Sequence, residues 1–299
     1  MGILYSTVEK NDSGVQNIPC LRTMSYLRSH LSLIRQLRFW GVHLAALIGV
    51  LYFGFSTSAI ICCVVLYFVR MFGVTAGYHR YFSHRSFKTT RVFAFLLALL
   101  AQSSGQRGVI WWARNHRHHH RYSDAPQDLH SPKQNGFWHA HIGWIFDDHA
   151  YQKHNNVRDL ERCWELRLLD RHPMYPAIAL GVLCWWFFDW PGLFAGFFLS
   201  TVLLFHGTFT INSLAHVWGN RRYQTKDTSR NNFFLALITL GEGWHNNHHH
   251  YMRSARQGFF WWEVDPTYYV LKLLSYVGIV WDLKEVSPKV RNAHKKDVI

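Results

Sequence analysis

Gly241-Glu242-Gly243-Trp244-His245-Asn246-Asn247-His248-His249 is a stretch in which three histidines stand at positions i, i+3 and i+4. In a helix, residues at this spacing lie on neighbouring faces, so their imidazole rings can reach the same interior space. Neutral imidazole is the commonest metal ligand in proteins, and it suits iron, zinc and copper alike. The spacing therefore predicts a metal site and leaves the metal open.

Two further histidine boxes occur earlier in the chain. One is a pair and the other repeats the His-x-x-His-His spacing, and their members are His79 and His84, then His116, His119 and His120. On an ideal helix, side chains at i+3 and i+4 diverge by roughly 100°, so each His-x-x-His-His box can serve two metals. A lone pair of this kind is more often an ordinary surface or core feature, but three boxes in one chain favour a site. The neighbouring His118 and His250 leave the ligand register open, because either could replace an adjacent histidine.

The composition indicates a membrane protein with a large water-facing part. Of the 299 residues, 49% are hydrophobic and 17% aromatic, while the mean hydropathy is −0.10. Aromatic side chains are enriched at both membrane interfaces. The net charge is +14, but a nucleic-acid-binding protein would not carry such long apolar runs. We therefore expect the positive charge to face anionic lipid headgroups, an anionic substrate or an acidic redox partner.

Four apolar runs are expected to cross a bilayer as helices, although the third is short and needs tilt, a thinner bilayer or interfacial tryptophan anchors. They cover residues 39–55, 59–77, 175–188 and 193–209. Lys and Arg are absent from the two short turns that join these runs in pairs and crowd their opposite ends, so the positive-inside rule puts those ends in the cytosol. We expect an all-α integral membrane protein with four transmembrane helices in two hairpins. A cytosolic helical domain should cap them and hold a histidine-ligated dimetal site.

The remaining segments complete this domain plan. The cap is expected to comprise residues 78–174 and 210–285, which makes 39–285 the main domain. Residues 1–38 form a polar, basic N-terminal arm in this plan, and 286–299 form a polar tail. Both termini and all three histidine boxes then lie on the cytoplasmic side of the membrane.

The end of the fourth apolar run adds Asn212 and His216, which share one helical face at i, i+4. A helix end that bonds its own cap would explain this pair alone, but beside eight other box histidines ligation is favoured. Nine histidines without clustered carboxylate ligands indicate two metals with open positions, because one structural zinc takes only four ligands. Iron is expected, since zinc has no redox chemistry.

Four polar residues are candidates to hold the ligand imidazoles through their second ring nitrogen. They are Asp124, Asp128, His141 and Glu242. A surface or structural role is the alternative for each of them.

In its motifs the chain resembles membrane fatty acyl desaturases of the stearoyl-CoA (acyl-CoA) Δ9 type. The resemblance covers residues 39–285 and is carried, in the right order, by 73–87, 112–120, 136–137 with 141–144, 212–216 and 241–249. The sequence Ser254-Ala255-Arg256, followed by Trp261-Trp262-Glu263-Val264-Asp265, is closer to bacterial and plant forms without a fused cytochrome b5 domain.

The resemblance implies a diiron centre that uses O2 and two electrons to remove two hydrogens from adjacent acyl carbons, leaving a cis double bond. The implied iron ligands, with the asparagine acting through water, are His79, His84, His116, His119, His120, Asn212, His216, His245, His248 and His249. In the family a bent tunnel carries the acyl chain past the metals. Gln106, Trp112 and Thr208 match the positions at its kink.

The resemblance also implies a headgroup site at Arg107 and Arg114. Arg114 matches the animal enzymes that bind coenzyme A, but Arg107 replaces an asparagine and Asn115 replaces an aspartate. A fatty acyl-CoA is the favoured substrate, and an acyl lipid of the membrane is the alternative.

The electron source is expected to be a separate protein. The sequence has neither a His-Pro-Gly-Gly cytochrome b5 motif nor a ferredoxin cysteine set, so cytochrome b5, ferredoxin or a reductase should dock on the basic cytosolic face. Two rival functions stay open. A hydroxylase or ketolase on the same scaffold would add one oxygen, and a metal transporter would normally hold its site near the membrane midplane.

Overall fold

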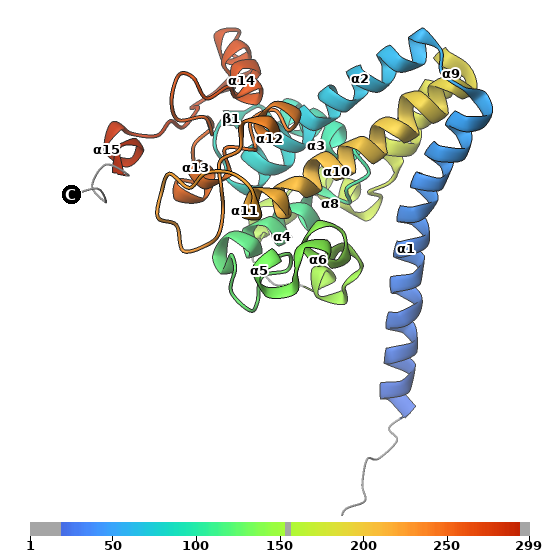
Figure 1. The fold of residues 1–299 in the computed structure, drawn as a ribbon. Coiled ribbons are helices and arrows are strands. Elements are labelled where there is room, and N and C mark those ends of the chain that lie inside the picture. Colours follow the sequence, from blue (N-terminus) through green and yellow to red (C-terminus); the bar gives the residue numbers. More distant parts are fainter. Residues whose placement is uncertain (1–18, 153–156, 294–299) are drawn as a thin grey trace, which may run out of the picture.

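The computed structural model describes residues 19–152 and 157–293, and these are mostly helical (Figure 1). Three helices are long and apolar enough to cross a membrane, and they cover Leu31–Phe53, Thr57–Ser83 and Tyr175–Val217. The first lies in α1 (Pro19–Phe53), and the second joins α2 (Thr57–Phe72) to the wider π-helical turns of η1 (Gly73–Ser83). The third consists of α9 (Tyr175–Pro191), η4 (Gly192–Leu199), α10 (Ser200–Asn212) and α11 (Leu214–Val217).

The third long helix contains both the third and the fourth predicted apolar runs. It is interrupted at Asp189, whose φ of 55° and ψ of −158° are not helical, so the break falls inside the predicted turn 189–192. The first predicted turn is also seen, because Gly54 has a φ of 71° and the hydroxyl of Ser56 accepts a hydrogen bond from the Ala59 amide to begin α2. Of the predicted N-terminal arm, residues 1–18 lie outside the described residues, and 19–38 belong to α1.

The water-facing part is built from short helices. Those before the third long helix are α3 (Arg91–Gln102), α4 (Val109–Tyr122), α5 (Pro132–Asn135), α6 (Phe137–His141), η2 (Gly143–Phe146), η3 (Asp148–Tyr151), α7 (Arg158–Glu161) and α8 (Trp164–Arg171). Those after it are α12 (Phe233–Ile238), α13 (His245–His250), α14 (Pro266–Tyr276) and α15 (Pro288–Arg291). One departure from an all-α fold is a two-residue strand pair, in which β1 (Lys88–Thr89) runs antiparallel to β2 (Val280–Trp281).

The main core ties η1 to the helices around it. Val74, Tyr78 and Phe82 of η1 pack with Leu97 of α3 and Ile110 of α4, and all five are buried. In Figure 1, α1, α2 and α9 meet at one end of the molecule, whereas α13, α14 and α15 lie at the other. The histidine boxes lie at the end of η1, on α4 and on α13, and the ring contacts of His79 with His116 and with His248 show that all three boxes meet.

Arg70 shows how the second long helix keeps a charge in an apolar setting. Its guanidinium is fully buried and faces the protein, where it donates hydrogen bonds to Thr201 Oγ1 at 2.8 Å and to Ser200 Oγ at 2.6 Å. Its Nε donates to the Leu66 carbonyl at 3.1 Å. All three nitrogens of the guanidinium therefore have partners within the helix bundle, which lowers the cost of burial.

Candidate metal centre

A first cluster of five histidines gathers rings from three separate parts of the chain. Its members are His79, His84, His116, His120 and His248, and each offers a ring nitrogen within 4.8 Å of the others. The Nε2 atoms of His79 and His248 are 3.0 Å apart, and those of His84 and His116 are 2.8 Å apart. His120 closes the set, because its Nε2 lies 2.9 Å from that of His248. Five ring nitrogens that converge on one point are better placed to bind a metal ion than to form hydrogen bonds with one another.

The π-helical turns of η1 explain why the first box has a spacing of five residues. On an α-helix, side chains at i and i+5 point roughly 140° apart. In η1 the backbone is wider, and the His84 amide donates to the His79 carbonyl at 3.2 Å, which is an i to i+5 bond. Residues five apart then point to nearly the same side. Isolated π-helical turns are frequent at functional sites.

A second cluster consists of four histidines, and its members are His119, His216, His245 and His249. The Nε2 atoms of His216 and His245 are 3.1 Å apart. The Nε2 atoms of His119 and His249 are buried and have no hydrogen-bond partner among the described residues. Because an unsatisfied buried nitrogen is costly, these two atoms fit the role of metal ligands.

Carboxylate oxygens contact the second ring nitrogen, Nδ1, of several clustered histidines. Asp128 Oδ1 lies 2.9 Å from His119 Nδ1, and Glu242 Oε2 lies 2.5 Å from His79 Nδ1. This is the role predicted for both carboxylates. Asp124 is more distant, since its Oδ2 lies 3.9 Å from His216 Nδ1, and His141 does not take this role, because its ring bonds to Ser213 and His206 instead.

Two members of the site were not predicted from the sequence. Asp227 Oδ2 lies 2.8 Å from Nδ1 of His249, although Asp227 stands in a polar loop where no pattern singles it out. His130 stacks on His119 with ring centroids 4.3 Å apart, and together with Asp128 these two histidines form a third group of possible ligands. Burial and the nearby charge of His119 lower the pKa of His130 to about 3. His130 lies outside any helical histidine spacing, so no sequence pattern reveals it.

Burial disfavours the charged form of three rings of the first cluster. Desolvation, followed by the charge of neighbouring histidines, holds the pKa of His84, His116 and His248 well below the ordinary value. A neutral ring presents a lone pair, which is the form that binds metal. His118 and His250 are in neither cluster, because their Nε2 atoms lie 2.8 Å and 3.1 Å from the carbonyls of Gln127 and Val290.

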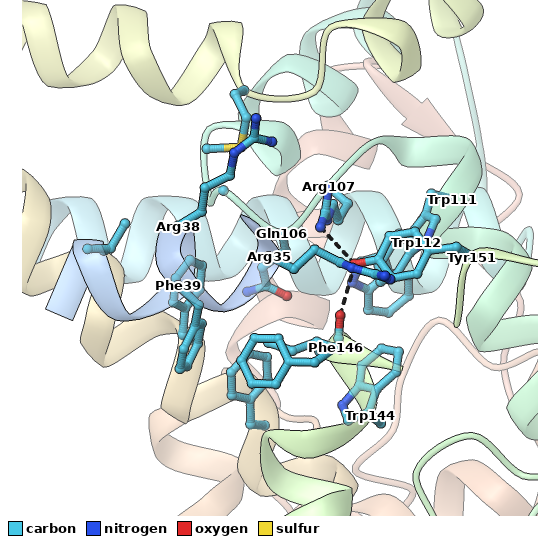
Figure 2. Close-up of a pocket in the computed structure, with 16 residues that line it drawn as sticks. Arg35, Arg38, Phe39, Gln106, Arg107, Trp111, Trp112, Trp144, Phe146 and Tyr151 are labelled. Carbon is cyan, nitrogen blue, oxygen red and sulfur yellow. Dashed lines mark hydrogen bonds between the residues drawn. The ribbon is translucent and has the colours of Figure 1, made fainter. Parts of the chain in front are cut away.

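A series of three overlapping cavities leads from the surface to the histidines. The outer cavity is lined by three arginines, Arg35, Arg38 and Arg107, and by aromatic side chains, several of which are labelled in Figure 2. A middle cavity shares Gln106 and Trp112 with the outer one. The inner cavity shares Trp112 with both and is lined by histidines of both clusters, among them His79 and His245. The overlapping cavities therefore connect the arginines of the outer cavity with the clustered histidines.

The residues predicted to form the kink meet where these cavities join. Gln106 Nε2 donates a hydrogen bond to Thr208 Oγ1 at 2.9 Å, which ties the segment before α4 to α10. The Trp112 ring is stacked between Tyr78, at 5.3 Å, and His116, at 4.9 Å between ring centroids. Asn212, one turn after Thr208, lines the inner cavity.

Comparison with known proteins assigns the family. A family model described as fatty acid desaturase matches residues 55–274. The chain belongs to the fatty acid desaturase family. It is 38% identical to an acyl-CoA C20 Δ5-desaturase of Anemone leveillei, over 77% of this chain and 75% of the relative. It is 36% identical to Δ9 acyl-lipid desaturase 1 of Arabidopsis thaliana, over 80% of this chain and 79% of that relative.

Family membership makes this desaturase an oxidoreductase of lipid metabolism, as predicted. Its long apolar helices agree with a membrane enzyme. A further relative, the palmitoyl-monogalactosyldiacylglycerol Δ7 desaturase of Arabidopsis thaliana, is 36% identical over 81% of this chain and 66% of its own length. The names of these relatives cover acyl-CoA and acyl-lipid substrates and three bond positions.

The two predicted headgroup residues of the desaturase lie in different settings. Arg107 lines the outer cavity, where its Nη2 donates to the Tyr151 hydroxyl at 2.7 Å (Figure 2). Arg114 is on α4, with Nη2 3.2 Å from Glu161 Oε1, and is not among the residues that line the outer cavity. Arg35 and Arg38, which also line the outer cavity, were not predicted as headgroup residues.

Proposed function

We propose that this desaturase introduces a cis double bond at Δ9 of a saturated fatty acyl chain, using a diiron centre and O2, with acyl-CoA as the favoured substrate. The observation that carries the proposal is the inner cavity, which places Trp112 and Thr208 beside histidines of both clusters. The nine clustered histidines would hold two iron ions, with Asn212 acting through water. Iron bound there supplies the oxidising chemistry that removes hydrogen from an unactivated carbon.

The protein itself would position the acyl chain and exclude water from it. The apolar walls of the cavities would exclude water from the acyl chain, and the bend at Gln106, Trp112 and Thr208 would fix which carbons lie beside the histidines. A misplacement of about 1 Å at such a site can cost on the order of 100-fold in rate. The bond position is therefore a property of the cavity.

The arginines of the outer cavity support an anionic headgroup. Arg38 and Arg107 line this cavity together with Arg35, which is already paired with Asp148, and guanidinium groups bind phosphate through paired hydrogen bonds. Both coenzyme A and phospholipid headgroups carry phosphate. The acyl-lipid alternative is supported by the Arabidopsis relative named as a Δ9 acyl-lipid desaturase.

The proposed membrane topology has four spans in two hairpins. The break at Asp189 supports a turn within the third long helix. The charge pattern of the sequence supports placing the histidine clusters and both termini on the cytoplasmic side.

The test is expression in a desaturase-deficient host, with gas chromatography and mass spectrometry of the fatty acids and of the lipid class that carries them. We expect a Δ9 monoene that has two hydrogens fewer than its parent. A product heavier by one oxygen would identify a hydroxylase, and a double bond elsewhere would correct the position. Purified protein supplied with stearoyl-CoA or with phosphatidylcholine would then separate the two substrate classes.

His249→Ala is the matching negative control. It should lose bound iron and activity, because the Nε2 of His249 is one of the unsatisfied nitrogens of the second cluster. His118→Ala, which removes a histidine outside both clusters, should still bind two iron ions per chain. Full activity in His249→Ala would count against the assignment of the ligands.

A further inference from the structure

A group of arginines and aromatic rings gathers on the surface beside the third histidine box. We call it the arginine–aromatic patch, and its members are Arg222, Phe260, Trp261, Trp262, Arg256 and Arg291. These residues come from the segment after α11, the loop between α13 and α14, and α15. Figure 1 shows α13 and α15 at the end of the molecule away from the turn between α1 and α2. Nothing in the proposed reaction at the cavity uses this patch.

The patch is ordered around Phe260. The guanidinium carbons of Arg222 and Arg291 lie 4.5 Å and 5.6 Å from the centroid of the Phe260 ring. Arg256 Nη2 donates to the Phe260 carbonyl at 2.9 Å. The Phe260 ring stacks on Trp262 at 4.7 Å, while Trp261 and Trp262 are 81% and 52% exposed. Exposed tryptophan beside held arginine is the composition typical of protein-binding hot spots.

The surroundings of the patch carry a strong positive charge. Residues 220–231, 250–265 and 284–293 contain nine Lys and Arg but four Asp and Glu. Three of these acidic residues, Asp227, Glu263 and Asp265, are buried. Their carboxylates contact His249, Arg222 and Arg80 respectively. The fourth, Glu285, is exposed and accepts a hydrogen bond from the Tyr268 hydroxyl at 2.7 Å. A surface of this charge attracts an acidic partner and speeds its association.

A stacked pair of rings connects the patch to the second histidine cluster. Tyr223 is buried and lies flat on His250, with centroids 3.9 Å apart and an angle of 5° between the planes. On the outer side, the Tyr223 hydroxyl donates to the Arg291 carbonyl at 2.6 Å. On the inner side, His250 is joined by one peptide bond to His249. A short path of stacked rings and one peptide bond thus leads from the surface to a residue of the metal centre.

We propose that the arginine–aromatic patch docks an acidic one-electron carrier protein and that the Tyr223–His250 stack is where its electrons enter the metal centre. The inference rests on the proposed function. Removal of two hydrogens from –CH2–CH2– with reduction of O2 to two waters requires two more electrons and two protons. The substrate supplies two of the four electrons that O2 accepts, and two docking events, each oxidising one carrier by one electron, supply the rest.

The stack is what favours a carrier over a membrane surface. Tryptophan and arginine also suit anionic lipid, and this surface could contact a bilayer on that ground. Lipid contact, however, gives no reason for two rings to be stacked between the patch and His249. Docking of an electron carrier gives such a reason, because short contacts between π systems favour electron transfer.

Docking is tested by binding, with no turnover required. The iron-loaded protein in neutral-lipid nanodiscs is titrated with the soluble domain of cytochrome b5 and, separately, with a plant-type ferredoxin, both acidic. In the double variant Arg253→Glu/Lys289→Glu, which reverses two exposed charges beside the patch, the Kd for the carrier that binds should rise at least tenfold at low salt. Lys133→Glu on α5, equally exposed, should leave that Kd unchanged. Equal affinities in the wild type and the double variant, or no binding of either carrier, would overturn the proposal.

Electron entry is tested by stopped-flow oxidation of the reduced carrier. Tyr223→Leu removes the ring and should slow electron transfer from the docked carrier at least tenfold while its Kd stays the same. Tyr223→Phe keeps the stack and should keep most of the rate. If Tyr223→Leu does not fold, Tyr223→Phe still tests the role of the stack. A tenfold loss of the electron-transfer rate in Tyr223→Phe, which keeps the ring, would contradict that role. An unchanged rate in iron-loaded Tyr223→Leu would contradict it as well.

Two further outcomes distinguish carrier docking from membrane contact and from failure of the proposed function. If the double variant binds the carriers normally but loses attraction to phosphatidylglycerol vesicles, the patch contacts the membrane and the proposal is wrong. The proposed function is checked independently by reducing the wild-type protein with dithionite and adding stearoyl-CoA and O2. If no double bond forms there, the proposed function fails, whereas failure of docking alone leaves it standing.

Discussion

Asp227 Oδ2 lies 2.8 Å from Nδ1 of His249, on the side of the ring that faces away from the second histidine cluster. The carboxylate accepts the Nδ1 proton, so Nε2 carries the lone pair that points into the cluster. Asp128 holds His119 in the same way. Burial would raise the pKa of Asp227, but the hydrogen bonds that it accepts from His249 and Ser229 lower that pKa below its ordinary value.

Asp227→Asn should weaken metal binding by the second cluster. The amide cannot supply the negative charge, and its NH2 group can face Nδ1 and stabilise the wrong tautomer. Loss of such a partner typically costs about 10–100-fold in metal affinity. Iron retained after equilibration with a graded series of chelator concentrations measures the effect.

Asp282→Asn is a suitable control for this measurement. Asp282 is a surface residue paired with Lys88 at 3.0 Å, away from both clusters. Its replacement should leave the iron content unchanged. Equal iron retention in Asp227→Asn and wild type would show that the His249 tautomer is set by some other group.

Arg80→Met should destabilise the fold and the first cluster together. Arg80 is buried between Glu242, at 3.1 Å, and Asp265, at 3.0 Å. Glu242 in turn holds His79. Removing the cation leaves two buried carboxylates without their partner, which typically costs about 3–5 kcal/mol. Thermal unfolding in detergent, followed by intrinsic fluorescence, measures the loss.

The matched variant is Arg85→Met, five residues further along. Arg85 also pairs with a carboxylate, Asp159, but its side chain is 62% exposed. An exposed pair contributes about 0–1 kcal/mol, so this variant should melt close to the wild type. A similar shift in both variants would mean that burial of the Arg80 network adds nothing to stability.

The sequence was enough to predict most members of the two histidine clusters because the spacing within each box is local. His116 with His119 and His120, and His245 with His248 and His249, needed only a helical turn to be recognised. The assignment of His118 and His250 was not local. It depends on which way each helix faces, and that is set by packing between distant segments.

The pair His79 and His84 shows a different limit. Their five-residue spacing does not fit one face of an α-helix, and the π-helical turns that bring them together are not encoded by any simple pattern. Asp227 and Tyr223 were missed for another reason. Each acts through a residue more than 20 positions away, so only the folded chain brings the partners together.

Gly243→Ala should disrupt the third histidine box. A Cβ at Gly243 would lie 2.1 Å from the Ala236 amide nitrogen and 2.5 Å from the Asn232 carbonyl oxygen, both backbone atoms at α12. Backbone cannot move aside as a flexible side chain can, so the turn that leads into His245 must shift. Overpacking of this kind typically costs about 1–3 kcal/mol, and the displaced ligand should also lower the iron content.

Gly41→Ala serves as the control for this substitution. Gly41 is in α1, and a Cβ added there would meet no atom within 4 Å outside its chain neighbours and the backbone of its own helix. Thermal stability and iron content should match those of the wild type. Normal iron content in Gly243→Ala would show that the box tolerates the shift.

Trp112→Ala should spread the position of the new double bond. Trp112 lines all three cavities, and its ring stacks on His116 at the point where the cavities join. Without the ring, the acyl chain can slide by one or more carbons past the histidines, so neighbouring bonds should be oxidised as well. Dimethyl disulfide adducts of the fatty acids from the expression host, analysed by mass spectrometry, give the distribution. Trp138→Ala, at a site 73% exposed, should keep the wild-type distribution. If Trp112→Ala remains active and yields the same single isomer, the bend that selects the bond lies elsewhere, and the hydrogen bond between Gln106 and Thr208 becomes the next element to remove.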